Sequence, residues 1–353
     1  VSTQSTGVST QSTGNKLGVG ITTPDGNILA NVRVTYNAPT GQGFLPQEVA
    51  KHHRENIIPL INKALNAAKI DLKDITIIAY TRGPGMGGPL AAVALVAKTL
   101  ALMMNIPLVP VNHCVAHIEM GRLVTKIENP IILYASGGNT QIIAYTQQKY
   151  RIFGEALDVA VGNCLDRFAR DAGIPNDPAP GLNIELFARR YRQKFPDGNG
   201  ELLGEIPISI KGMDISCSGL NSWLKNYIEK SIQHLPPVEK QDKIDQLCYT
   251  LQEYLFSSLV EITERAAAHL DIKDFICVGG VGCNERLQEM LKIMAEERGG
   301  KVGGMDERYC IDNGAMISWC GWKVFNQDGG IDPAEANVSQ RWRTDAPIIK
   351  WRD

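Results

Sequence analysis

The length, composition and charge of the chain limit the kinds of protein to which it can belong. Its 353 residues are enough for two domains, each with a core of its own. The 44% hydrophobic and 21% charged residues are typical of a folded globular enzyme and exclude a disordered or fibrous chain. A formal net charge of −2 excludes strong overall attraction to nucleic acid, so a nucleic-acid substrate would need a local basic patch or a helper subunit.

The cysteines and the apolar runs indicate a protein of a reducing compartment outside the membrane. The eight cysteines are scattered without any C-x-x-C pair, which is typical of free thiols. The longest apolar run, residues 89–104, is interrupted by Lys98 and Thr99, which argues against a membrane span.

Residues 1–14 are two copies of the heptapeptide VSTQSTG. They contain no arginine, no apolar core and no small-residue cleavage site, so they are neither a signal nor a transit peptide. Their composition has poor strand character. We therefore expect residues 1–14 to form an irregular tail.

Residues 15–130 have the pattern of a first α/β lobe. Two short strands flank a PDGN turn at 24–27. The elements expected after this hairpin are a helix at 46–69, a strand at 74–81 ending in a glycine-rich turn, an apolar helix at 90–105 and a buried strand at 107–113. Strands that alternate with helices indicate a parallel or mixed sheet with covered faces.

Residues 131–330 repeat this order in a second lobe. We expect strands at 130–136, 140–146, 150–157 and 274–280 and helices at 160–172, 244–270, 284–299 and 313–325. Residues 191–241, richer in Pro, Gly and charge, are interpreted as an insertion, and residues 331–353 as a C-terminal tail that packs on the lobes. The sequence thus predicts a duplicated α/β fold of two lobes with a cleft between them.

The first candidate site is the histidine pair His113 and His117. At helical spacing their side chains lie on one face, about 5–6 Å apart, which is close enough to share a metal ion. The alternative is an ordinary pair of histidines on a helix. A metalloprotease of the H-E-x-x-H kind needs a glutamate directly after the first histidine, where this chain has Cys114, so that interpretation lacks its general base.

Two glycine-rich turns are candidate phosphate sites. Residues 134–141, YASGGNTQ, form either a cradle of backbone N–H groups or a plain hairpin turn. Residues 277–287, CVGGVGCNERL, read as strand, glycine turn and helix, and a helix N-terminus favours a phosphate. Neither stretch contains G-x-G-x-x-G or G-K-[ST].

Several carboxylates and basic clusters allow two interpretations each. Asp312 precedes a helix and is either its cap or a metal ligand. Asp166 and Glu185 lie near glycines and either accept hydrogen bonds from ribose hydroxyls or line solvated helix faces. The basic clusters at 51–54, 189–194 and 341–353 either contact nucleic-acid phosphates or are solvated surface.

Eight motifs, in order along almost the whole chain, carry a resemblance that no single motif does. They are GFLP…HHR, AYTRGPGMGGPL, VNHCVAHIEMGR, YASGGNTQIIAY, GNCLDRFAR, SCSGL, GGVGCNERLQEM and CIDNGAMI. Together they resemble the universal tRNA N6-adenosine threonylcarbamoyltransferase family (TsaD/OSGEP-like), and most closely its eukaryotic and archaeal branch, the catalytic subunit of the KEOPS complex.

The resemblance implies a fold and an activity. The fold is the two-lobed one of actin, the heat-shock chaperone ATPases and the sugar kinases. The activity is the metal-dependent transfer of a threonylcarbamoyl group from threonylcarbamoyl-AMP to N6 of the adenosine 3′ of the anticodon in tRNAs that read ANN codons.

The resemblance also implies the residues of the site. The metal ligands and catalytic residues would be His113, His117, Tyr134 and Asp312, around one divalent ion, Zn or Fe, per subunit. The phosphate and carbamoyl part of the donor would lie against Tyr134, Ala135, Ser136, Gly137 and Gly138, and its nucleoside against Asp166, Gly181, Glu185 and Asn284. An ATP-like nucleotide could occupy the same cleft.

The chain departs from the family at its start, where members have an apolar strand and a first phosphate loop of the form E-G-S-A-N-K. Only Asn15 and Lys16 of that loop remain. We expect either that the repeat replaces the first strand or that the start of the chain has been altered, and in both cases the stability of the first lobe and donor binding are affected.

Partners, location and competing functions complete the expectations. The resemblance implies tRNA and the KEOPS/EKC subunits as partners, namely a small atypical kinase, a dimerising subunit and a kinase-binding subunit, with no membrane. We expect a cytoplasmic and nuclear protein. The alternatives are a metallopeptidase of the O-sialoglycoprotein endopeptidase kind and a nucleotide-binding scaffold without catalysis.

Overall fold

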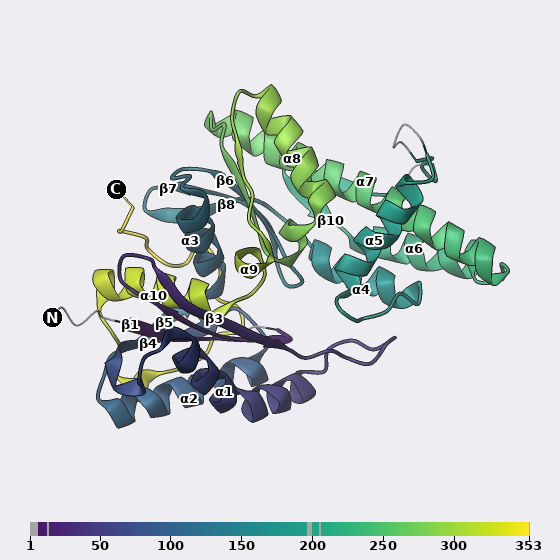
Figure 1. Ribbon diagram of the computed structural model, residues 1–353. Helices are drawn as coiled ribbons and strands as arrows, with labels where there is room; N and C mark the ends of the chain where they lie inside the picture. Colours follow the sequence, from purple (N-terminus) through teal and green to yellow (C-terminus); the bar gives the residue numbers. More distant parts are fainter. Residues whose placement is uncertain (1–5, 13, 196–199, 205, 353) are drawn as a thin grey trace.

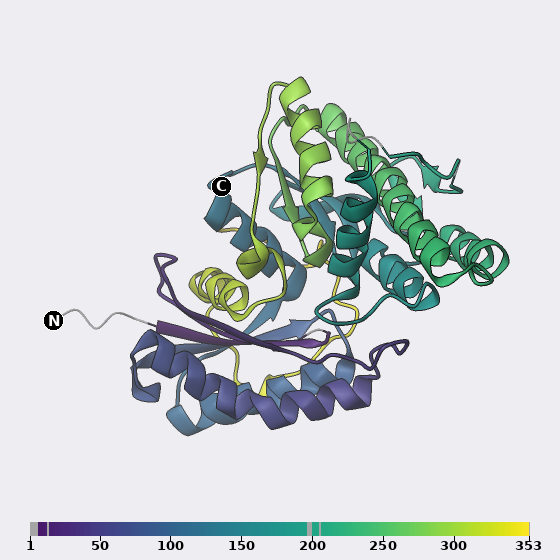
Figure 2. The same cartoon turned by 45° about the vertical axis from the view of Figure 1, so that its right-hand side comes forward.

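The computed structural model describes residues 6–12, 14–195, 200–204 and 206–352, and in them the chain forms two lobes, each built on a five-stranded sheet (Figure 1). In the first sheet the strand order is β3-β2-β1-β4-β5. The strands are β1 (Thr6–Ser12), β2 (Lys16–Thr22), β3 (Ile28–Thr35), β4 (Ile75–Gly83) and β5 (Leu108–Asn112). Helices α1 (Pro46–Ala68) and α2 (Gly87–Met104) cover one face of this sheet, and α10 (Gly314–Asp328) covers the other (Figure 2).

The expectation of an irregular tail is wrong for residues 6–12. Strand β1 lies at the centre of the sheet, antiparallel to β2 and parallel to β4. Its backbone groups are therefore paired on both sides, and this pairing outweighs the low strand propensity of its side chains. Residues 7, 9 and 11 face α10, as the close approach of Gly7 to Trp322 and the bond from Ser9 to Gly314 show, whereas Val8 packs with the core under α1 and α2.

The second sheet has the strand order β12-β11-β6-β7-β8. Its strands are β6 (Ile131–Ala135), β7 (Thr140–Thr146), β8 (Lys149–Glu155), β11 (Phe275–Val278) and β12 (Val302–Gly303). The helices of this half are α3 (His113–Thr125), α4 (Val161–Asp171), α5 (Pro180–Arg192), α6 (Ser218–Tyr227), α7 (Pro237–Leu270), α8 (Glu285–Glu297) and α9 (Glu307–Cys310), with a ribbon of β9 (Ser209–Lys211) and β10 (Asp214–Ser216). Helix α8 thus follows the glycine-rich turn after β11, and the start of α4 contacts the glycine turn after β6, where Gly162 N donates a hydrogen bond to Ser136 O at 3.1 Å.

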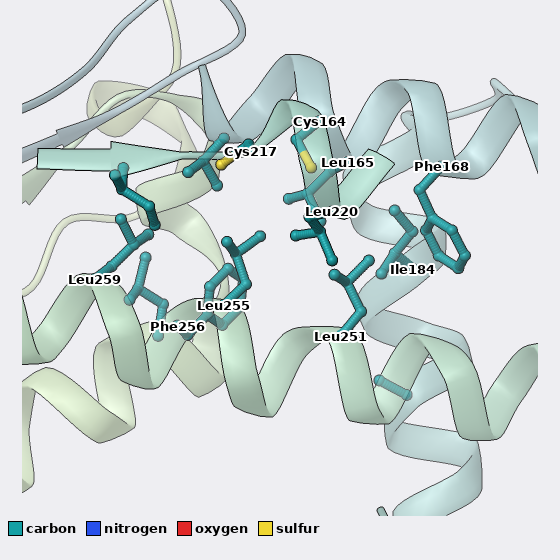
Figure 3. Packing of buried hydrophobic residues seen from close by; sticks show 14 of the residues in the cluster. Cys164, Leu165, Phe168, Ile184, Cys217, Leu220, Leu251, Leu255, Phe256 and Leu259 are labelled. Carbon is teal, nitrogen blue, oxygen red and sulfur yellow. The ribbon is translucent and has the colours of Figure 1, made fainter. Parts of the chain in front are cut away.

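The core of the second lobe is built around the long helix α7. Leu251, Leu255 and Leu259, spaced four residues apart, form one buried stripe on this helix (Figure 3). The stripe faces side chains from α4, α5 and α6, among them Phe168 and Leu220. This packing fixes α4 and α5, which carry Asp166, Gly181 and Glu185, relative to each other.

The structure shows where three segments of the expected domains pack. Helix α10 follows the second lobe in sequence but packs on β1, β2 and α3. The described part of the segment 191–241 contributes to the second core, where Leu220 and Leu224 are fully buried. The tail after α10 runs over both lobes, from a bridge between Ile331 and Leu108 to a hydrogen bond from Ile349 N to Gln148 O.

One helix in the described part of the chain, α2, is long and apolar enough to cross a membrane, judged by length and composition alone. Its buried side, with Leu90, Val93 and Ala97, contacts α1 and β4. We therefore assign α2 to the core of the first lobe. Leu95 and Met103 remain exposed on its other side.

We predict that replacing Thr10 by valine stabilises the protein. The Thr10 hydroxyl is buried and has no hydrogen-bond partner within the described residues, and a valine of the same shape removes that cost. The free energy of unfolding, measured by urea denaturation, should rise by about 1 kcal/mol. Thr22→Val is the matched control, because the buried Thr22 hydroxyl does form a hydrogen bond, 2.7 Å from Ser318 Oγ, and its loss should lower stability. A lower free energy of unfolding in Thr10→Val would contradict the conclusion that the Thr10 hydroxyl is buried without a hydrogen-bond partner in the described part of the chain.

Candidate metal and donor site

The histidine pair owes its position to the start of helix α3. Asn112 is the N-cap residue: its Oδ1 accepts hydrogen bonds from the backbone N–H groups of Cys114 and Val115, at 3.0 and 3.2 Å. His113 and His117 follow in the first two turns, both are buried, and their ring centroids are 4.7 Å apart. The sequence spacing therefore does place both imidazoles on one face.

Asp312 completes a cluster of three potential ligands. His117 Nε2 lies 3.0 Å and His113 Nε2 lies 3.4 Å from the same oxygen, Oδ1 of Asp312. One ligand atom from each of the three residues lies within 4.8 Å of the others, which suits a single metal ion. The capping role that we considered for Asp312 belongs to its neighbour, because Asn313 Oδ1 accepts the hydrogen bond from Met316 N at 3.0 Å.

Tyr134, the last implied ligand, packs beside this cluster. It lies on β6, fully buried, with its ring centroid 5.3 Å from that of His117. Its hydroxyl forms no hydrogen bond of standard geometry to any described residue, and its polar neighbours are the side chains of Ser136 and Cys114. A buried hydroxyl in this state fits the requirement for a further ligand, and two imidazoles with a carboxylate suit Zn and Fe alike.

The electrostatics of the cluster also suit a cation. Burial would raise the pKa of the Asp312 carboxyl, but the adjacent His113 and His117 hold that pKa well below its usual value. Burial lowers the pKa of His117, against the opposing effect of Asp312. Near neutral pH the cluster therefore offers a carboxylate and a neutral His117 imidazole, the protonation states that bind metal.

The glycine turn after β6 has open space around its two glycines. Ser136 closes the turn, with its backbone N–H donating to Asn139 O at 2.8 Å and its Oγ accepting from Asn139 N at 3.1 Å. A Cβ placed on Gly137 or Gly138 would meet nothing within 4 Å. The turn therefore presents backbone rather than side chains beside Tyr134, as a phosphate cradle requires.

Asp166 lies on α4, near two cations. Burial raises the pKa of its carboxyl to about 6, and Lys16 and Arg170 only partly oppose this effect. Lys16 begins β2 of the first lobe, so it brings a positive charge across to a carboxylate of the second lobe. Lys16, one of the two residues that remain of the first phosphate loop, thus lies near the expected donor site.

Glu185 and Asn284 meet at the start of α8. Glu185 Oε1 accepts a hydrogen bond from Glu285 N at 3.1 Å, and Asn284 caps α8 while its Nδ2 donates to Gln252 Oε1 at 3.0 Å. A cavity of ≈ 310 Å³ adjoins Glu185, between α5, α7 and α8. Gly181 has open space at its Cβ position. The structure brings Glu185 and Asn284 together, whereas Asp166 lies on a different helix, α4.

The sequence analysis missed one residue of the site, Gln11. Its Nε2 donates a hydrogen bond to Asp312 Oδ2 at 3.1 Å from the centre of β1. A signal for it existed, because counting back from Asn15 and Lys16 places Gln11 where the family loop has its glutamate. The polar repeat concealed this match.

In two of the basic clusters, several side chains form ion pairs or hydrogen bonds with carboxylates of the same chain. The pairs of cluster 189–194 are Arg189 with Glu185 and Glu285, Arg190 with Asp245, Arg192 with Glu289, and Lys194 with Asp242. In the C-terminal cluster Trp351 Nε1 donates to Glu119 Oε1 at 3.0 Å, and Arg343 pairs with Glu155 and Asp345. The charges of the paired basic residues are thus partly neutralised by neighbouring carboxylates.

Solved structures of low sequence identity share this architecture. HypF from T. kodakarensis superposes with a TM-score of 0.59 at 14% identity, covering 92% of this chain and 48% of that chain. Component A of the (R)-2-hydroxyglutaryl-CoA dehydratase from Acidaminococcus fermentans superposes with a TM-score of 0.51 at 12% identity, covering 90% and 97%. These likenesses confirm the predicted two-lobed α/β fold of the actin and sugar-kinase class.

Sequence comparison identifies the family. Residues 27–319 match the family model TsaD, described as tRNA N6-adenosine threonylcarbamoyltransferase. A relative named "Probable tRNA N6-adenosine threonylcarbamoyltransferase" from Drosophila melanogaster is 51% identical over 96% of both chains. The enzymes from Encephalitozoon cuniculi and Homo sapiens, named as tRNA N6-adenosine threonylcarbamoyltransferases, are 53% and 50% identical over 96% of this chain and 97% of theirs. The chain therefore belongs to the TsaD family of tRNA N6-adenosine threonylcarbamoyltransferases.

Proposed function

We propose that the protein transfers a threonylcarbamoyl group from threonylcarbamoyl-AMP to N6 of the adenosine 3′ of the anticodon in tRNAs that read ANN codons. The observation that carries the proposal is the cluster of His113, His117 and Asp312, assembled beside an open glycine turn in a chain about half identical to enzymes named for this reaction. The ion would be one divalent Zn or Fe per subunit, held by these residues and Tyr134.

The reaction needs orientation more than strong acid or base catalysis. The donor is a mixed anhydride, so AMP leaves readily once the adenine amine attacks the carbamoyl carbon. A metal ion at the cluster would supply Lewis-acid stabilisation of charge on the donor's oxygens. We assign no residue to accept the proton that N6 loses.

Different residues of the chain would bind different parts of the donor. The backbone from Ala135 to Gly138 would hold the phosphate and carbamoyl part, because it is open and rich in N–H groups. Asp166 would accept a hydrogen bond from a ribose hydroxyl, and Gly181, Glu185 and Asn284 would contact the rest of the nucleoside. Lys16 would add a positive charge opposite Asp166.

The metallopeptidase alternative lacks a base in the structure as it does in the sequence. Cys114 occupies the position after His113, and burial raises the pKa of its thiol to about 11. A group that keeps its proton near neutral pH cannot activate water for peptide hydrolysis.

We propose tRNA and the KEOPS subunits as partners, in the cytoplasm and nucleus. The net charge of −2 and the internal pairing of cluster 189–194 leave little positive surface for tRNA, which supports a need for helper subunits. Eight free cysteines support a reducing compartment.

Transfer should depend on the histidine cluster. We predict that His113→Ala reduces formation of the modified adenosine by at least about 100-fold, because loss of a ligand removes the ion from the site. The assay supplies the chain and its partner subunits with preformed threonylcarbamoyl-AMP and unmodified tRNA, with detection by mass spectrometry. His234→Ala, at an exposed histidine outside every candidate site, is the control. Donor binding without any transfer by the wild-type chain would favour the scaffold alternative.

The ionised carboxylate of Asp166 should lower the free energy of unfolding above pH 6, although the same group helps to bind the donor. Its folded pKa, about 6, is raised above the ordinary value of 3.8, so the folded state holds the proton longer and loses stability as the pH rises through that window. We predict that Asp166→Asn stabilises the donor-free protein by about 1–3 kcal/mol at pH 8, with little gain near pH 4, and weakens donor binding.

Urea unfolding at pH 8 and pH 4 measures the first effect of Asp166→Asn, and calorimetry with the donor measures the second. Asp171→Asn changes an exposed carboxylate at the end of the same helix and should alter neither. Equal stabilisation at both pH values would exclude a raised pKa as the cause.

A further inference from the structure

Strand β1 is in direct contact with the segment that carries Asp312. Ser9 Oγ donates a hydrogen bond to Gly314 O at 2.5 Å, and Ser318 Oγ donates to Gly7 O at 2.8 Å. These two bonds join the polar face of β1 to the first turns of α10. The start of α10 is thereby tied to the repeat sequence.

The neighbouring strand β2 also packs closely against the start of α10. Gly20 of β2 pairs with Ser9, and a Cβ on Gly20 would lie 2.2 Å from Ala315 N. A Cβ on Gly314 would lie 2.1 Å from Gly20 N. The backbone of β2 therefore packs directly against the backbone at the start of α10. This contact fixes the position of the residues just before Gly314, including Asp312.

Gln11 connects strand β1 directly to the proposed metal ligand Asp312. The Gln11 side chain is fully buried, and its Nε2 lies 3.1 Å from Asp312 Oδ2, while Asp312 Oδ1 faces His113 and His117. The two oxygens of one carboxylate thus have different partners on opposite sides. Hydrogen bonds of this kind orient a ligating carboxylate and tune its affinity for metal.

We propose that strand β1 (Thr6–Ser12) positions the metal site, and that Gln11 is the residue that orients Asp312. An amide suits this place because it donates to the carboxylate. The glutamate that the family loop has here would, if ionised, bring a second negative charge to Asp312 in the metal-free protein. The inference rests on the proposed function only for the identification of the metal site.

The first test is the affinity of the full-length protein for Zn²⁺ alone, measured by competition with a chromophoric chelator. Gln11→Met keeps the length of the side chain and removes its donor, so Zn²⁺ should bind about 10-fold more weakly. Gln246→Met is the matched control, because Gln246 is also buried and donates one hydrogen bond, to Glu201 O at 3.2 Å, but lies on α7 of the other lobe. Its Zn²⁺ affinity should equal that of the wild type.

A double-mutant cycle separates positioning from general damage to the fold. If Gln11 acts through Asp312, Gln11→Met should change Zn²⁺ affinity little in an Asp312→Ala background. An equal loss of affinity in both backgrounds would mean that Gln11 supports the lobe as a whole and would overturn the proposal.

A second variant covers the case in which Gln11→Met does not fold, as judged by circular dichroism. Gln11→Asn keeps an amide in the strand but withdraws it by about one C–C bond, ~1.5 Å, so it too should weaken Zn²⁺ binding. Wild-type affinity in Gln11→Asn would overturn the proposal. Because neither tRNA nor donor is present, a failure of the transfer reaction would leave this result unaffected.

Discussion

A carboxylate with only 18% of its side chain exposed needs polar partners on all sides, because an isolated ion away from water is costly. Asp312 meets this need with imidazoles from α3 and an amide from β1. Three segments far apart in sequence must therefore converge on one side chain. The site depends on this convergence, since the same interactions keep the carboxylate ionised and oriented toward a metal ion.

Helix α3 is held at its beginning and at its middle, which restrains the imidazoles relative to the lobes. At the beginning, Asn112 donates from Nδ2 to the carbonyl oxygens of Trp342 and Arg343 while its Oδ1 caps the helix. At the middle, the buried Glu119 accepts hydrogen bonds from Trp351 and Tyr150. The C-terminal tail supplies a partner at both places, which gives it a structural reason to cross both lobes (Figure 1).

The elements that could be predicted from the sequence are those whose apolar periodicity decides their burial. Helices α1 and α8 begin and end within a few residues of the expected positions for this reason. The histidine pair could be predicted as candidate ligands from spacing, but their union with Asp312 came from the resemblance to a family, because spacing carries no information on contacts across the chain. The placement of α10 on the first sheet could not be predicted either, since sequence order does not say which sheet a helix covers.

Strand β1 could not be predicted from strand propensity, because one of its faces packs on α10 and the other packs on the core, and each favours different side chains. Positions 7, 9 and 11 face α10, where a glycine or a polar side chain is needed for close approach and for hydrogen bonds to Gly314 and Asp312. Val8 and Thr10 alternate with them on the core side, where an apolar residue would serve better than the buried hydroxyl of Thr10. A central strand can thus be polar at no loss to the site, provided that its register puts the polar partners on the α10 face. A slip of one residue would turn Gln11 toward the core and remove its bond to Asp312, so the register fixed by β2 and β4 is a condition for the geometry of the candidate metal site.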